Sequence, residues 1–239
     1  MLGNVAEDPS TEEHLLRGTL AHAFFEAIGR GMDAEKAKLL VMEAFERIQD
    51  VPQWQLRFKL DEFSALLDRA REWARQSEVN QELVGVEIPV GVHVGEGVRI
   101  GGYMDRLLRD EEGNYLVVDL KTGKNQPAKK EAEDHVQLMT YQLALAHGAF
   151  DGHQVHDGEG MPRQGGVLVY PGATTKKIGE IWQSDKSPEA LEEFAALLPP
   201  LVEEMRGPRI TARTNKDCDK CPIRSICPCL LYTSDAADE

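Results

Sequence analysis

The segment spanning residues 101–123 constrains the fold of this 239-residue chain more than any other stretch. Its second half, residues 115–120, is an apolar and largely β-branched run that ends in charged residues and a Thr-Gly pair. This pattern is typical of a buried strand whose last residues leave the core. Because side chains alternate along a strand, Asp119 and Lys121 are expected to point to the same side.

A partner strand is expected just upstream, over residues 98–107. Residues 110–114, Asp-Glu-Glu-Gly-Asn, supply the turn chemistry of a hairpin between the two strands. Antiparallel pairing of these strands would bring Asp105 beside Asp119.

Two carboxylates and one ammonium group at a strand end suit a divalent metal. Asp105 and Asp119 offer hard oxygen ligands for Mg²⁺ or Mn²⁺, and the backbone carbonyl of Leu120 is a further candidate ligand. Lys121 could orient or help deprotonate an attacking water. Such a site suits phosphodiester hydrolysis. The alternative for an isolated Asp-x-Lys is an exposed strand end with a salt bridge.

Three motifs, in this order and at this spacing, resemble the RecB-type branch of the PD-(D/E)xK nucleases: Gly102-x-x-Asp105-Arg106, Val118-Asp119-Leu120-Lys121-Thr122-Gly123 and Gln137-x-x-x-Tyr141. The resemblance covers nearly all of residues 10–228. It implies an α/β fold of the restriction-endonuclease type, in which helices flank a central mixed sheet. An N-terminal helical insertion and a C-terminal cysteine staple would complete this fold.

The resemblance also implies roles for individual residues. A divalent metal would be held by His22, Asp105, Asp119 and the Leu120 carbonyl, and Lys121 would act on the attacking water. Two further residues would lie beside the metal site and contact the DNA strand, namely Gln137 and Tyr141.

His22 lies far from these motifs in the sequence, on a helix expected over residues 8–28. A lone helical histidine is usually a surface or capping residue, but Gly18 and His22 fit the G-x-x-x-H spacing that the family carries on its first helix. Only the tertiary fold can bring His22 to Asp105. Glu87 matches the family's acidic residue on the preceding strand and is a further candidate for the site.

The apolar periodicity predicts the remaining elements. Trp54 and Trp73 are interpreted as core residues and not as DNA-stacking residues. Further helices are expected over residues 33–49, 52–79, 129–146 and 188–205, and further strands over 84–90, 167–170 and 178–182.

Composition and charge limit the cellular context. The chain is 41% hydrophobic and 28% charged, which is ordinary for one globular domain. It has no apolar run long enough to span a membrane and no signal-peptide pattern at its start, so a cytoplasmic location is expected. Its net charge of −14 argues against a free-standing domain that holds DNA on a broad basic surface. A helicase motor that delivers the DNA, in the same or a partner chain, is therefore expected.

All four cysteines fall in one short segment, which suggests metal binding more than disulfides. The spacing of Cys218, Cys221 and Cys227 resembles part of the four-cysteine staple of AddB, AdnB and Cas4-type nucleases. The resemblance implies a 4Fe–4S cluster, with a fourth cysteine upstream that this sequence lacks. Cys229 could supply a fourth thiolate, and zinc is the alternative metal.

The end of the sequence, residues 229–239, is interpreted as a non-native tail that resembles the translation of a sequencing adapter. This interpretation assigns Cys229 to the tail. Residues 1–228 would then form one RecB-like nuclease domain, truncated at its N-terminus.

The sequence as a whole predicts a DNA nuclease that serves in double-strand-break repair. Within the superfamily it looks closest to the C-terminal nuclease domains of AdnAB- and AddAB-type helicase-nucleases. Two alternatives remain: a stand-alone Cas4-like exonuclease in CRISPR adaptation, and an inactive module that guides a DNA strand.

Overall fold

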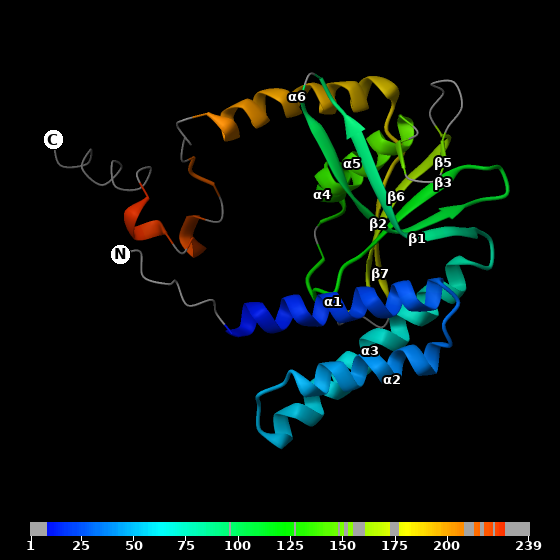
Figure 1. Ribbon diagram of the computed structural model, residues 1–239, viewed down its shortest axis with the longest axis vertical. Helices are drawn as coiled ribbons and strands as arrows, with labels where there is room; N and C mark the ends of the chain where they lie inside the picture. Colours follow the sequence, from blue (N-terminus) through cyan, green and yellow to red (C-terminus); the bar gives the residue numbers. More distant parts are fainter. Residues whose placement is uncertain are drawn as a thin grey trace.

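The computed structural model has a central mixed sheet with helices on both faces, as the sequence predicted (Figure 1). It describes residues 9–95, 97–126, 128–147, 149–150, 153–154, 161–172, 177–207, 213–215, 218–221 and 223–227. The tail at residues 229–239 lies outside the described residues. Among the described helices, none is long and apolar enough to cross a membrane.

The described strands form one sheet in the order β5-β4-β1-β2-β3-β6-β7. The long hairpin of β1 and β2 and the neighbouring β3 are antiparallel, while β3 and β6 run parallel. The strands are β1 (Glu82–His93), β2 (Arg99–Arg109), β3 (Tyr115–Leu120), β4 (Ala149–Phe150), β5 (His153–Gln154), β6 (Arg163–Tyr170) and β7 (Gly179–Gln183).

Three helices cover one face of the sheet: α1 (Pro9–Gly29), α2 (Ala34–Arg47) and α3 (Gln53–Ser77). Their apolar stripes meet in a core where Phe45 and Phe63 stack with ring centroids 4.4 Å apart. Trp73 is buried in this core, as predicted, and its indole N–H donates to Glu180. The core prediction for Trp54 was wrong, since its side chain is 74% exposed. Trp54 lies one residue after the Pro52-capped start of α3, before the apolar stripe begins.

The other face carries α4 (Lys129–Glu133), α5 (Val136–Ala146) and α6 (Pro188–Arg206). The sequence predicted one helix over residues 129–146, and the structure corrects this to two. The break carries no proline or glycine. Its carbonyls are bound instead by the side chain of Gln183 from β7, so a tertiary contact overrides the local helical preference.

Strand β1 changes its alternation at Glu87, which has a positive φ of 48°. On one side of it, Val86 faces α1, close to Gly29. On the other side, Ile88 belongs to the core beneath α5. Residues 86 and 88 would face the same side in a regular strand. A positive φ is uncommon for a non-glycine residue and often marks functional sites, and here it occurs next to the predicted metal centre.

Candidate metal centre

The sheet brings the two predicted aspartates to the same place. The β2–β3 ladder pairs Arg106 with Val118, so the next pair outward is Asp105 with Asp119. Asp105 Oδ2 accepts the backbone N–H of Leu120 at 2.6 Å, which fixes that carboxylate against the end of β3. Both carboxylates are buried, with Asp105 8% and Asp119 1% exposed.

His22 reaches this strand end from α1. Its Nδ1 lies 3.2 Å from Asp105 Oδ1. Gly18, one turn earlier, faces the strand end, where a Cβ at that position would lie 3.4 Å from Thr122 Oγ1. The fold therefore joins the first helix to the hairpin across the intervening helical insertion.

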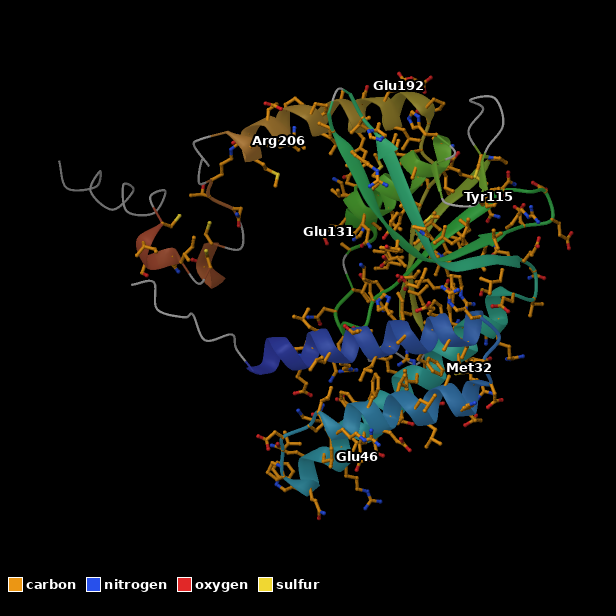
Figure 2. The ribbon with its side chains drawn as sticks, in the orientation of Figure 1. Met32, Glu46, Tyr115, Glu131, Glu192 and Arg206 are labelled. Atoms are coloured by element: carbon orange, nitrogen blue, oxygen red, sulfur yellow. The ribbon has the colours of Figure 1, made fainter. Side chains whose placement is uncertain are left out.

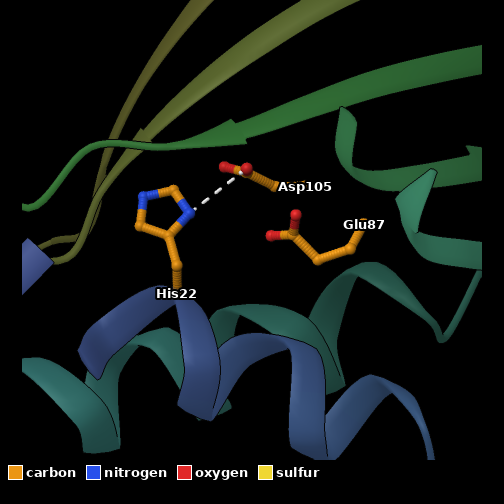
Figure 3. A group of neighbouring side chains, drawn as sticks. All are labelled: His22, Glu87 and Asp105. Carbon is orange, nitrogen blue, oxygen red and sulfur yellow. Dashed lines mark ion pairs between the residues drawn. The ribbon is translucent and has the colours of Figure 1, made fainter. Parts of the chain in front are cut away.

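Glu87 completes a cluster of three side chains that could hold a metal ion (Figure 3). The β1–β2 pairs on either side of Glu87 place it opposite Asp105. Ligand atoms of His22, Glu87 and Asp105 all lie within 4.8 Å of one another. The strand irregularity at Glu87 is what turns its carboxylate toward His22, a feature that the sequence motif alone does not reveal.

Asp119 and Lys121 form a pair beside this cluster. Lys121 Nζ lies 2.8 Å from Asp119 Oδ2, so the two side chains do point the same way. Apart from this ion pair, the buried oxygen has no hydrogen-bond partner. A buried carboxylate oxygen with one ion pair and no hydrogen bond retains lone pairs that suit a bound cation. Asp119 is not part of the 4.8 Å cluster itself.

The charges of the site shift its titrations. Burial and the nearby charge of Asp105 raise the pKa of Asp119 to about 6, against the opposing effect of Lys121. Burial and the Asp105 charge also raise the pKa of Glu87. For His22, burial lowers the pKa, but the hydrogen bond and charge of Asp105 outweigh it and the pKa is raised. The carboxylates of Glu87, Asp105 and Asp119 therefore concentrate negative charge at the strand end, as a cation site requires.

Gln137 and Tyr141 connect α5 to the strand ends. Lys121 Nζ donates to Gln137 Oε1 at 2.7 Å, and Gln137 Nε2 donates to the Tyr141 hydroxyl at 2.9 Å. The Tyr141 hydroxyl in turn donates to the carbonyl of Tyr103 at 2.5 Å. Burial raises the pKa of Tyr141 to about 12, so it remains a hydrogen-bond donor. Both residues of the Gln-x-x-x-Tyr motif thus hold the neighbours of the cluster in place.

An open groove of about 620 Å³ lies over the cluster, between α1 and the sheet. His22, Glu87, Asp105 and Thr122 line it, together with further residues of α1 between His14 and Glu26. An open groove admits an extended chain better than an enclosed pocket would.

The described cysteines are far from the groove residues in the sequence, and none of them lines the groove. Cys218 and Cys221 flank one short turn, and Cys227 follows a second. The backbone N–H of Asn215 donates to Cys218 Sγ at 3.1 Å. Among the residues that the structure describes, the thiols do not form a group comparable to His22, Glu87 and Asp105. The fourth cysteine, Cys229, falls outside the described residues.

A mixed sheet with carboxylates and a lysine at adjacent strand ends, next to a helical histidine, is the arrangement that a metal-dependent nuclease requires. The chain belongs to the PD-(D/E)XK nuclease superfamily, whose family model matches residues 2–228. It is also similar to the solved crystal structure of SSO0001, with 18% identity, a TM-score of 0.42, and coverage of 92% of this chain and 97% of that chain. No curated protein matches this sequence.

Glu87 gives a direct test of the ligand cluster. We expect Glu87→Gln to weaken Mn²⁺ binding about 10- to 100-fold, because one anionic oxygen is lost from a small ligand set. Isothermal titration calorimetry with the full chain measures this change. Glu26 also lines the groove but lies outside the cluster, so Glu26→Gln is the matched control and should change the affinity less than about threefold. Equal losses in the two variants would remove Glu87 from the ligand set.

Proposed function

We propose that this chain is a Mg²⁺- or Mn²⁺-dependent deoxyribonuclease. The observation that carries the proposal is the meeting of Asp105, Asp119 and Lys121 at adjacent strand ends, beside His22. Carboxylates at such a strand end hold a divalent ion, which neutralises charge that develops on a phosphate and lowers the pKa of bound water. The groove above the cluster gives a DNA strand access to it.

Each residue has a proposed role. His22, Asp105 and Asp119 hold the metal with the Leu120 carbonyl, and we add Glu87 to this set on its geometry. The Leu120 N–H bond to Asp105 orients that carboxylate.

One residue acts on the attacking water, and two others hold that residue in place. Lys121 orients the attacking water, and Gln137 holds the lysine in place through its amide oxygen. Tyr141 supports Gln137 and fixes the β2 backbone at Tyr103, two residues before Asp105. These contacts hold the reacting groups in one geometry, which is a large part of catalysis.

The net charge of −14 supports a nuclease module that works beside a DNA-delivering partner. We propose a helicase motor as that partner and DNA end processing in double-strand-break repair as the role. An acidic surface repels DNA and lowers the rate of encounter. Tethering to a motor removes this limit, because it raises the effective concentration of the strand at the groove.

The three described cysteines support a second proposed cofactor, a 4Fe–4S cluster that staples the C-terminal segment. Cys218, Cys221 and Cys227 are all partly buried, and a complete cluster needs a fourth thiolate. Iron and sulfide analysis of anaerobically purified protein tests this proposal, and a zinc content without iron would contradict it.

The nuclease proposal is tested by cleavage of end-labelled single-stranded DNA. We expect cutting with Mg²⁺ or Mn²⁺ and none with EDTA, because the metal supplies the nucleophile and the charge neutralisation. Comparing the cleavage rates of a DNA oligonucleotide and an RNA of the same sequence, at the same concentration, shows which of the two is the substrate. A folded protein that binds the strand and never cuts it would favour the strand-guiding module instead. Circular dichroism establishes the folded state in each case.

A further inference from the structure

The break between α4 and α5 lies directly before Gln137, the residue that contacts Lys121. At this break the side-chain nitrogen of Gln183 lies near three backbone carbonyls. Its Nε2 is 2.9 Å from the oxygen of Ala132, 3.1 Å from that of Glu133 and 3.2 Å from that of His135. The last carbonyls of a helix lack their usual i+4 partners. From the backbone, the Ala132 carbonyl accepts the N–H of His135, whereas the His135 carbonyl, just before α5, accepts the N–H of Met139. Gln183 therefore caps α4 from a different element of the fold.

Gln183 is itself held firmly. It is 1% exposed, and its amide oxygen accepts from Gln142 Nε2 at 2.8 Å. Gln142 is fully buried on α5, donates to the Ser184 carbonyl at 3.1 Å and accepts the Lys186 N–H at 2.9 Å. Both amides thus form a closed network between β7 and the α4–α5 break. Such buried polar networks specify one arrangement when every member is satisfied.

Ion pairing strengthens the same junction. Glu133, the last residue of α4, accepts from the Ser184 hydroxyl at 2.7 Å and pairs with Lys186 Nζ at 2.6 Å. These hydrogen bonds lower the pKa of Glu133, with that from Lys186 the largest contribution. The end of α4 is therefore fixed to the segment after β7 by side-chain contacts as well as by Gln183.

Two glycines of β6 allow the end of β7 and the start of α5 to lie close to this strand. A Cβ on Gly165, which has a φ of +104°, would lie 2.2 Å from the carbonyl oxygen of Gln183. A Cβ on Gly166 would lie 3.0 Å from Leu138 Cδ2 on α5. The paired glycines of β6 therefore let the end of β7 and the first turn of α5 pack on the same stretch of strand.

We propose that Gln183, held by Gln142, is a positioning residue that sets the contact between Gln137 and Lys121. Gln137 is the second residue of α5, so its place depends on where that helix begins. The local sequence favours one continuous helix, and Gln183 holds the break open by binding its carbonyls. The inference rests on the proposed nuclease function for its catalytic consequence, but the geometry of the junction does not depend on that function.

The test replaces Gln183 with methionine, which keeps the length of the side chain and removes its donor and acceptor. We expect Gln183→Met to lower kcat about tenfold with KM changed less than about twofold, because the lysine loses its fixed geometry. In a Gln137→Ala background the same substitution should lower kcat no further, since the contact it supports is already gone. Equal losses in both backgrounds would reduce Gln183 to a structural role and overturn the proposal.

Hydrogen exchange gives a readout that needs no activity. We expect backbone amides of Val136–Tyr141 to exchange faster in Gln183→Met than in the wild type. Gln164 is the matched control, because its amide on β6 binds Asp110 at 2.6 Å in a different turn. Gln164→Met should leave both kcat and the exchange of α5 unchanged.

These two readouts separate the two proposals. A wild-type chain without metal-dependent cleavage would overturn the nuclease function, while faster exchange at the start of α5 in Gln183→Met would still support the positioning role. Unchanged exchange would overturn the positioning role whatever the activity.

Discussion

Replacing Lys121 with alanine is expected to lower the rate of DNA cleavage at least about 1000-fold, an effect of the size seen when a preorganised charged or donor group is removed from an active site. Lys121 lies between the buried Asp119 carboxylate and the Gln137 amide, and its side chain leaves the strand end without entering the core. Circular dichroism should therefore show a folded protein. Asp119→Ala should cause a loss of similar size, because it removes a proposed metal ligand. Single-turnover cleavage of end-labelled DNA measures both variants.

The matched control for this prediction is Lys124→Ala. Lys124 lies three residues further on, is 47% exposed at its side chain and pairs with Glu62 on α3. Exposed ion pairs of this kind contribute little, so the cleavage rate should change less than about threefold. Retained cleavage in Lys121→Ala, with the control unchanged, would refute the assignment of Lys121 to the reaction.

The parts of the fold that follow from short-range patterns were predictable. Strand alternation and the Asp- and Gly-rich turn placed Asp105 and Asp119 on neighbouring strands, and the structure has this hairpin. Family spacing pointed to His22, and its contact with Asp105 required the whole fold to form. Helices α2, α3 and α6 fall within a few residues of the predicted ranges, because their apolar stripes are long and regular.

Features that depend on tertiary contacts were not predictable. The α4–α5 break is set by Gln183, which lies some fifty residues away in the sequence. The positive φ of Glu87 has no glycine or proline to signal it. Trp54 is exposed because it lies at the start of α3, well before Phe63, the first buried residue of that helix. In each case the local sequence is compatible with the more regular alternative, and long-range packing decides the outcome.

Replacing Asp119 with asparagine is expected to stabilise the metal-free protein at pH 8 by about 3 kcal/mol. Burial and the Asp105 charge raise the pKa of Asp119 from 3.8 to about 6 in the folded protein. Between pH 4 and pH 6 the folded state therefore binds more protons than the unfolded state, so stability falls as the pH rises through this window. Above pH 6 the full loss of stability from ionising the buried carboxyl applies, at about 1.4 kcal/mol for each pKa unit between the folded and unfolded states. Asparagine cannot ionise and avoids this cost.

Urea denaturation of the metal-free protein at several pH values measures the effect. The advantage of Asp119→Asn should shrink as the pH falls through 6 and disappear below about pH 3, where the wild-type carboxyl is protonated in both states. Lys121→Met should do the opposite and destabilise the protein at pH 8, because it removes the cation that offsets the buried charge. A pH-independent gain in Asp119→Asn would contradict the electrostatic explanation.

Saturating Mg²⁺ should cancel this advantage, because a ligand at 100 times its dissociation constant stabilises the state that binds it by about 2.7 kcal/mol. The wild type gains this free energy and Asp119→Asn gains less, so the order of stability at pH 8 should equalise or reverse when the metal is added. Two buried carboxylates side by side are unfavourable for the empty protein and favourable for the metal-bound one. The carboxylates that the proposed reaction needs therefore destabilise the folded protein when no metal is bound. An equal gain from Mg²⁺ in both proteins would show that Asp119 is not a ligand.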